Sequence, residues 1–224
     1  MSVIRVPRQR AIIDRRQLAS GIEALVGEHG DKARPHVVGL LYDYNCYYCL
    51  QTHQHLQAAL DRYPGQIVVV LLPTAIDPAC NPYVQNVSPV SLSSCAIAKL
   101  ALAVWIADPS QLAEFDEFLI VQSPRHKRDG SVPPEVVDTT FRAEAARLVG
   151  EDELMKALAD PLIDDRLARS ADIYRMAGVV TGTPPGVPRV IIGERVYGSF
   201  ESADQLADAI EAAYPSLKPD EQNR

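Results

Sequence analysis

The pattern of apolar and polar positions predicts two buried strands early in the chain. Residues 36–44 and 66–73 are nearly continuous apolar runs without a period of two, which is typical of strands covered on both faces. Between them, residues 46–62 mix polar and apolar positions without Gly or Pro and therefore predict a helix. Asn45 stands where the N-cap of that helix is expected. A strand, a helix and a strand with short connections form a βαβ unit, so we expect the two strands to be parallel.

Helical patterns dominate the middle of the chain. The predicted helices cover about 91–107, 110–121, 134–149, 151–159 and 161–177. No convincing strand pattern lies between them, so we expect an all-helical insertion. The chain then returns to strands, because 187–193 and the residues from 196 onward predict a hairpin. Residues 202–214 predict an amphipathic helix.

These patterns predict an α/β protein in four parts. An α/β domain is assembled from 35–90 and 179–214, with the helical insertion at 91–178 between its halves. Residues 1–34 form an N-terminal extension, and 215–224 have the composition of a flexible tail. The 224 residues are 47% hydrophobic, which is enough apolar material for one well-buried core.

Charge and hydropathy narrow the range of partners. The formal net charge is −7, which argues against nucleic acid and membrane surfaces as partners. One local basic cluster, residues 125–128, is interpreted as a solvated loop. No stretch approaches the roughly 20 apolar residues of a membrane span. The basic start is not followed by an apolar core, so no signal peptide is visible, and this favours the cytoplasm if the chain is complete.

Four cysteines carry the candidate chemistry. Four are too few for a disulfide scaffold in a chain of this length, and two of them form the C-x-x-C pair Cys46-Tyr47-Tyr48-Cys49 at the start of a predicted helix. A thiolate is favoured there by unpaired N–H groups and by the helix dipole. We predict that Cys46 is the attacking sulfur. Cys49 lies one turn deeper on the same face, where it can resolve a mixed disulfide.

The C-x-x-C pair and its neighbours also have other interpretations. Zinc binding with His53 and His55 is less favoured, because neither a second C-x-x-C nor a spaced His pair is present, and we predict no metal. His53 shares the helical face of the cysteines and either favours the thiolate or is an ordinary boundary residue. Asp43 either accepts a proton from Cys49 or is a solvated carboxylate at a strand end.

Residues 35–214 contain, in order, a strand, the C-x-x-C pair at a helix start, a helical insertion and a strand opened by Val187-Pro188. In this order and spacing they resemble the DsbA-like branch of thioredoxin-fold thiol–disulfide oxidoreductases. More narrowly, three segments look like the thioredoxin-like domains associated with bacterial vitamin K epoxide reductase homologues. These segments are 42–46 (Tyr-Asp-Tyr-Asn-Cys), 77–82 (Asp-Pro-Ala-Cys-Asn-Pro) and Cys95 leading into 101–105. The resemblance implies a thioredoxin-like fold with a helical insertion.

The resemblance also implies a cis-proline that faces the active-site disulfide. By position this is Pro188, preceded by Val187, although Pro184 and Pro185 are rivals. A proline there leaves neighbouring backbone free to pair with an extended substrate. Strongly oxidising members carry Pro-His between the cysteines. The pair Tyr47-Tyr48 here leaves oxidant, reductant and isomerase open, and it could instead form an apolar docking surface.

Cys80 and Cys95 have three interpretations: a structural disulfide, a shuttling dithiol or two unpaired buried thiols. A structural disulfide is preferred, since closing a loop of about 15 residues stabilises by roughly 3 kcal/mol in the chain-entropy model.

Taken together, the sequence predicts a protein-disulfide oxidoreductase without a cofactor. Its expected partners are proteins with thiols or disulfides, and the resemblance adds a quinone-linked membrane reductase homologue and an oxidising compartment, the periplasm. Two alternatives stay open. One is a non-catalytic binding module with a static disulfide, and the other is a glutathione-dependent enzyme on the same scaffold.

Overall fold

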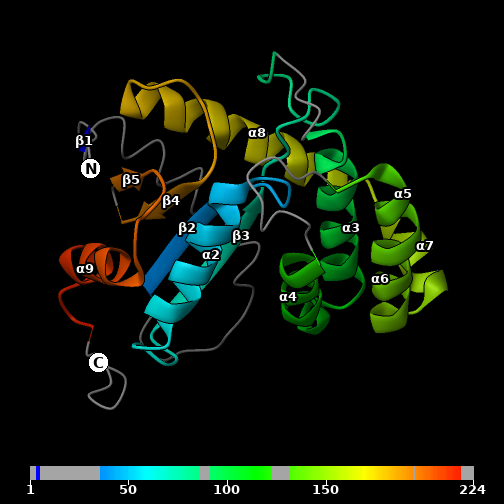
Figure 1. Ribbon diagram of the computed structural model, residues 1–224, viewed down its shortest axis with the longest axis horizontal. Helices are drawn as coiled ribbons and strands as arrows, with labels where there is room; N and C mark the ends of the chain where they lie inside the picture. The colour runs from blue at the N-terminus through cyan, green and yellow to red at the C-terminus, as the bar shows by residue number, and fades with distance from the viewer. Residues whose placement is uncertain (1–3, 6–35, 86–90, 123–131, 194, 218–224) are drawn as a thin grey trace. The chain divides into compact units, whose positions relative to one another are not determined.

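The computed structural model describes residues 4–5, 36–85, 91–122, 132–193 and 195–217 (Figure 1). Most of the predicted N-terminal extension, the basic cluster at 125–128 and the end of the predicted tail lie outside the described residues. The described chain forms two compact units. The first unit takes its residues from 1–41, 51–72 and 176–224, and the second takes them from 42–50 and 73–175.

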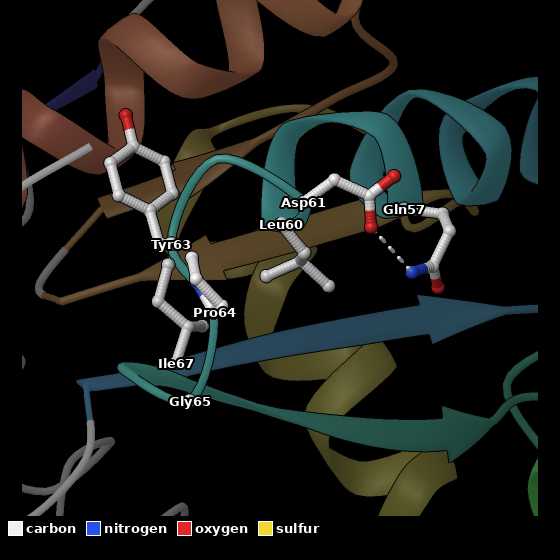
Figure 2. Close-up of a pocket in the computed structure, with 7 residues that line it drawn as sticks. All are labelled: Gln57, Leu60, Asp61, Tyr63, Pro64, Gly65 and Ile67. Atoms are coloured by element: carbon white, nitrogen blue, oxygen red, sulfur yellow. Dashed lines mark hydrogen bonds between the residues drawn. The ribbon is translucent and has the colours of Figure 1, made fainter. Parts of the chain in front are cut away.

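A mixed five-stranded sheet forms the first unit, with the strand order β1-β5-β4-β2-β3. The strands are β1 (Ile4–Arg5), β2 (His36–Tyr42), β3 (Ile67–Pro73), β4 (Arg189–Ile192) and β5 (Arg195–Tyr197). The arrows of β2 and β3 point the same way in Figure 2, as the βαβ pattern predicts. β4 is antiparallel to both β2 and β5, so the predicted hairpin is present. The sequence did not reveal β1, which adds two residues beside β5.

β2 runs through the interior of the sheet, between β4 and β3. All residues from Val38 to Tyr42 are buried in succession, without alternation between the two sides. That is the pattern of a strand covered on both faces. The uninterrupted apolar run in the sequence therefore reflects a central strand.

The helix α2 (Tyr47–Leu60) follows β2, and its residues from Gln51 onward belong to the first unit. It ends in a turn in which Gly65 has a φ of +70°, a conformation that glycine adopts without strain. A pocket of about 410 Å³ lies at this turn. Figure 2 shows the residues that line it, among them Gln57, whose amide donates a hydrogen bond to Asp61; the distance is 3.3 Å. The residues that line this pocket belong to the end of α2 and the turn after it, and they form no candidate catalytic site.

Two further features complete the first unit. The helix α9 (Ala203–Ala213) is capped by Ser202, whose hydroxyl accepts a 3.2 Å hydrogen bond from the Gln205 N–H, and its apolar face contacts β4. At the end of α8 (Leu162–Thr181), Gly178 lies directly against Pro185. A Cβ at position 178 would stand 2.9 Å from the Pro185 ring, so only glycine allows this approach.

Helices build the second unit, as the sequence predicted for this part of the chain. They are α3 (Ser94–Ala107), the 3₁₀-helix η2 (Pro109–Gln111), α4 (Leu112–Gln122), α5 (Pro134–Val136), the π-helix η4 (Val137–Phe141), α6 (Arg142–Val149), α7 (Glu151–Leu158) and the first part of α8. α3 contacts α4, α6 and α7, and its residues from Leu100 to Val104 are all buried. A helix that is apolar around its circumference belongs in the middle of a bundle.

Candidate active site

The pair Cys46 and Cys49 stands at the beginning of α2, and neither cysteine forms a disulfide in this structure. The carbonyl of Cys46 accepts hydrogen bonds from the N–H groups of Cys49 (3.0 Å) and Leu50 (3.1 Å). Cys46 is therefore the N-cap residue of α2. The prediction that Asn45 caps this helix is wrong by one residue, because the first intrahelical bond already starts from the cysteine.

Asn45 is instead a buried link between segments of the second unit. Its N–H donates a 2.6 Å hydrogen bond to a carboxylate oxygen of Asp43, and its side-chain oxygen accepts one of 3.2 Å from the Val132 N–H. Both the backbone and the side chain of the residue before Cys46 are thus held by hydrogen bonds. This holds the start of α2 in place.

The two thiols differ in burial and acidity. Cys46 is 9% exposed and Cys49 is fully buried. A hydrogen bond from the Cys49 side chain lowers the pKa of Cys46, and nearby backbone N–H groups add to this effect. Burial raises the pKa of Cys49, and its proximity to Cys46 raises it further. The arrangement favours a thiolate at Cys46 and a protonated thiol at Cys49.

Asp43 is a buried carboxylate, not a solvated one, with 2% of its surface exposed. Besides the Asn45 N–H, it accepts hydrogen bonds from the Ile76 N–H (2.7 Å) and from the Ser94 hydroxyl (3.0 Å). Its negative charge raises the pKa of both Cys46 and Cys49. It therefore opposes, in part, the groups that stabilise the thiolate.

A second buried carboxylate, Asp116 on α4, holds the segment that leads to the cysteines. The hydroxyls of Tyr42 (3.0 Å) and Tyr44 (2.7 Å) both donate to one of its oxygens, and the two hydroxyls also contact each other. Burial raises the pKa of both phenols well above their ordinary value, and the Asp116 charge adds to it. Sequence reasoning missed this cluster, because its partners lie more than 70 positions apart.

The residues between the cysteines face outward to different extents. Tyr48 is 41% exposed and Tyr47 is half-buried, and their rings meet edge to face with centroids 5.3 Å apart. His53 is half-buried and lies on α2 within the first unit. The structure thus places an aromatic pair beside Cys46 in the chain.

Cys80 and Cys95 are joined by a disulfide, with their Cα atoms 5.6 Å apart. Cys95 is the second residue of α3, and Cys80 lies in the loop after β3. Of the three interpretations offered by the sequence, two unpaired thiols is therefore wrong. Whether the bond serves stability or electron transfer stays a prediction.

Val187–Pro188 is a cis peptide bond in the first unit, and it is the one cis bond among the described residues. The rivals Pro184 and Pro185 have no cis bond. The predicted role of Val187 and Pro188 in binding substrate stays a prediction.

The described part of the chain brings together no group of three or more His, Cys, Asp or Glu side chains that could hold a metal ion. Within the same residues, no helix combines the length and apolar character needed for a membrane crossing.

Together, the sheet with its helical insertion and the C-x-x-C at the start of a helix define a thioredoxin-like fold of the DsbA type. Several solved structures that resemble this chain are named as thiol–disulfide exchange proteins or oxidoreductases. The catalytic domain of Proteus mirabilis ScsC matches at a TM-score of 0.57 and 20% identity, over 89% of this chain and 97% of that one. The thiol-disulfide exchange protein α-DsbA2 of Wolbachia pipientis matches at 0.60 and 16% identity, over 91% and 97%.

A third similar structure is a periplasmic thioredoxin-like protein of Salmonella enterica serovar Typhimurium, with a TM-score of 0.52, 18% identity and coverage of 84% and 89%. At these identities the likeness shows the fold. No family model matches the chain. A curated bifunctional uridylyltransferase/uridylyl-removing enzyme of Erythrobacter litoralis (strain HTCC2594) is 60% identical over 37 residues, but these cover only 16% of this chain and 4% of that enzyme. So short a match brings no activity to this chain.

Proposed function

We propose that this protein exchanges a Cys46–Cys49 disulfide with the thiols of other proteins. The observation that carries the proposal is the placement of the two thiols at the start of α2, where Cys46 is the N-cap residue and 9% exposed and Cys49 is fully buried. This placement lowers the pKa of Cys46 and raises that of Cys49. A nucleophile that is held as a thiolate and a resolving thiol that stays protonated are what dithiol exchange requires.

In the oxidised protein, a substrate thiolate attacks the sulfur of Cys46, and Cys49 leaves and takes up a proton. A second substrate thiol then attacks the mixed disulfide and releases Cys46 as a thiolate. The substrate gains a disulfide and the protein gains two electrons. A stabilised thiolate favours the reduced protein, so the proposed direction is oxidation of the substrate.

The exposed ring of Tyr48, packed against Tyr47, supports docking of an apolar substrate segment beside Cys46. The family resemblance implies a role of Val187 and Pro188 in substrate binding, because a proline leaves neighbouring backbone free to pair with an extended substrate. We place the reaction in oxidative folding in the periplasm, where the Salmonella protein of this fold is found. A membrane partner of the vitamin K epoxide reductase type would return the pair to the disulfide state.

The test is turnover of a reduced, unfolded protein that must form disulfides to become active. Wild-type protein in the oxidised state should restore the activity of reduced ribonuclease, and Cys46→Ser should not. Trapping by Cys49→Ser should yield a mixed disulfide that contains Cys46. Equal yields with wild type and Cys46→Ser would refute the proposal.

A further inference from the structure

The second disulfide and the first cysteine pair share a structural element, the Asp43 carboxylate. Two of its hydrogen-bond donors come from the two segments that the Cys80–Cys95 bond ties together. The Ile76 N–H lies four residues before Cys80, and the Ser94 hydroxyl belongs to the residue next to Cys95. Another donor to Asp43 is the N–H of Asn45, the residue that immediately precedes Cys46 in the chain.

This disulfide also borders an accessible space in the second unit. Cys80 lines a pocket of about 560 Å³ together with Tyr83, Lys99 and Asp172. The Tyr83 hydroxyl donates a 2.7 Å hydrogen bond to Asp172, and Lys99 pairs with Asp164 at 3.0 Å. Cys80 and Cys95 are only half-buried. A small thiol can therefore approach Cys80 from this pocket.

Cys95 is placed to leave when Cys80 is attacked. It lies in the first turn of α3, a helix of 14 residues, where free N–H groups and the helix dipole stabilise a thiolate. Lys99 follows one turn later on the same face, where its charge is paired with Asp164. The two sulfurs of the bond thus differ: Cys80 is the one that an incoming thiolate attacks, and Cys95 is the leaving group.

We propose that the Cys80–Cys95 disulfide is a second centre, reducible by a low-molecular-weight thiol, whose state sets the reactivity of the Cys46–Cys49 pair through the Asp43 carboxylate. The inference rests on the proposed exchange activity of the first pair. It gives the second disulfide a role in tuning that activity.

The reducing step balances with two molecules of thiol. A thiolate attacks the Cys80 sulfur, the bond to Cys95 breaks, and Cys95 leaves as a thiolate that takes up a proton. A second thiolate attacks the small-molecule sulfur of the mixed disulfide, so a small-molecule disulfide departs and Cys80 becomes a thiol. Two electrons and two protons thereby pass from the two thiols to the protein.

Breaking the bond releases the Ile76 loop from the start of α3 and loosens two donors to Asp43, the Ile76 N–H and the Ser94 hydroxyl. A buried carboxylate that loses donors either moves toward water or takes up a proton. Both outcomes weaken its negative charge at Cys46. The thiolate at Cys46 then becomes more favourable, and the first pair becomes more oxidising.

The first experiment asks whether the bond is reducible in the folded protein. Native protein is incubated with reduced glutathione, alkylated and mapped by mass spectrometry, while circular dichroism monitors the fold. The proposal expects Cys80 and Cys95 to be alkylated while the protein stays folded. Reduction only in denaturant would overturn it.

The second experiment measures coupling in the variant Cys80→Ser/Cys95→Ser. The thiolate titration of Cys46 should move to lower pH, and the equilibrium constant of the first pair with glutathione should change by about fivefold or more toward the reduced protein. Ser94→Ala, which keeps the disulfide, should shift both values in the same direction. Ser110→Ala, which removes a serine hydroxyl that donates a 2.7 Å hydrogen bond to the exposed Asp108 carboxylate, is the matched control and should leave both unchanged.

The role of Asp43 is tested by repeating the double substitution in an Asp43→Asn background. The coupling should then disappear, because the charge that carries it is gone. An undiminished shift in that background, or no shift in either cysteine or Ser94 variant, would overturn the inference. If the first pair fails to exchange with glutathione in wild type, the proposed function itself is wrong, so the two failures are distinguishable.

Discussion

The two cysteine pairs of the second unit both use the start of a helix, but they differ in what the bond between their sulfurs holds. Cys46 and Cys49 are three residues apart at the start of α2, so opening their bond leaves the helix intact. Cys80 and Cys95 are 15 residues apart and join a loop to α3. A short local bond can cycle without disturbing the fold, whereas a bond between segments changes what those segments support.

The largest expected effect is on the rate of disulfide transfer, which distinguishes the Cys46–Cys49 pair from the Cys80–Cys95 pair. Cys46→Ser removes the nucleophile, and the rate of disulfide transfer to reduced ribonuclease should fall by about a thousandfold or more. Cys80→Ser/Cys95→Ser should keep measurable transfer, because neither residue is needed for the first exchange. Loss of transfer in the double variant that equals the loss in Cys46→Ser would erase the distinction between the pairs.

The next effect is on stability, to which the Cys80–Cys95 pair is expected to contribute more than the Cys46–Cys49 pair. Cys80→Ser/Cys95→Ser should lower the free energy of unfolding by about 3 kcal/mol, since the chain-entropy cost of a 15-residue loop returns to the unfolded state. Urea unfolding followed by circular dichroism measures it. Cys46→Ser breaks no bond that closes a long loop. Its free energy of unfolding should therefore be close to that of wild-type protein in which only the Cys46–Cys49 pair is reduced. Equal losses in both would mean that loop length does not separate the pairs.

A smaller effect concerns what fixes the segment before Cys46. Asp116→Ala leaves two buried phenol hydroxyls without their acceptor and should cost about 2 kcal/mol of unfolding free energy. Glu114→Ala on the same helix removes only an exposed ion pair with Arg147 and should change stability little. A loss from Asp116→Ala no greater than that from Glu114→Ala would show that the tyrosine cluster does not support the segment.

The smallest effect is a change in pH dependence. Because the pKa of Cys46 is lowered from its ordinary 9.0, its alkylation rate should fall as the pH drops through that lowered pKa and level off above it. Cys49→Ala removes the largest cause of the lowering, so the midpoint should move to higher pH. Iodoacetamide kinetics measure it, and the bonded Cys80 and Cys95 do not contribute. An unchanged midpoint would contradict the hydrogen bond from Cys49 as the cause.

The difference between the pairs also explains how far the sequence could be interpreted. The helix start at Cys46 is a local property of a strand followed by a segment free of Gly and Pro, and it was predicted to within one residue. The central strand β2 was visible for the same reason, since burial on both faces demands an apolar run.

The groups that surround the reactive pair could not be predicted, because they depend on chain segments that meet only in the folded protein. In the sequence, Asp43 cannot be distinguished from an ordinary carboxylate at a strand end. Its hydrogen bonds with Ile76 and Ser94 form only in the folded protein. Asp116 lies in an unremarkable helical segment, and nothing local marks it as the acceptor for two tyrosines. The strand β1 has two residues, too few to leave a periodic signal.

The contact between Gly178 and Pro185 limits which sequences can follow this chain path. Any side chain at position 178 would collide with the proline ring, and the backbone nitrogen of Pro185 stands only 3.0 Å from the place of a Cβ. Relief would come from displacing the short segment that runs into Val187–Pro188. Homologous chains that keep this path are therefore expected to keep glycine at the position, and a library of substitutions there should recover almost no folded variant other than the parent.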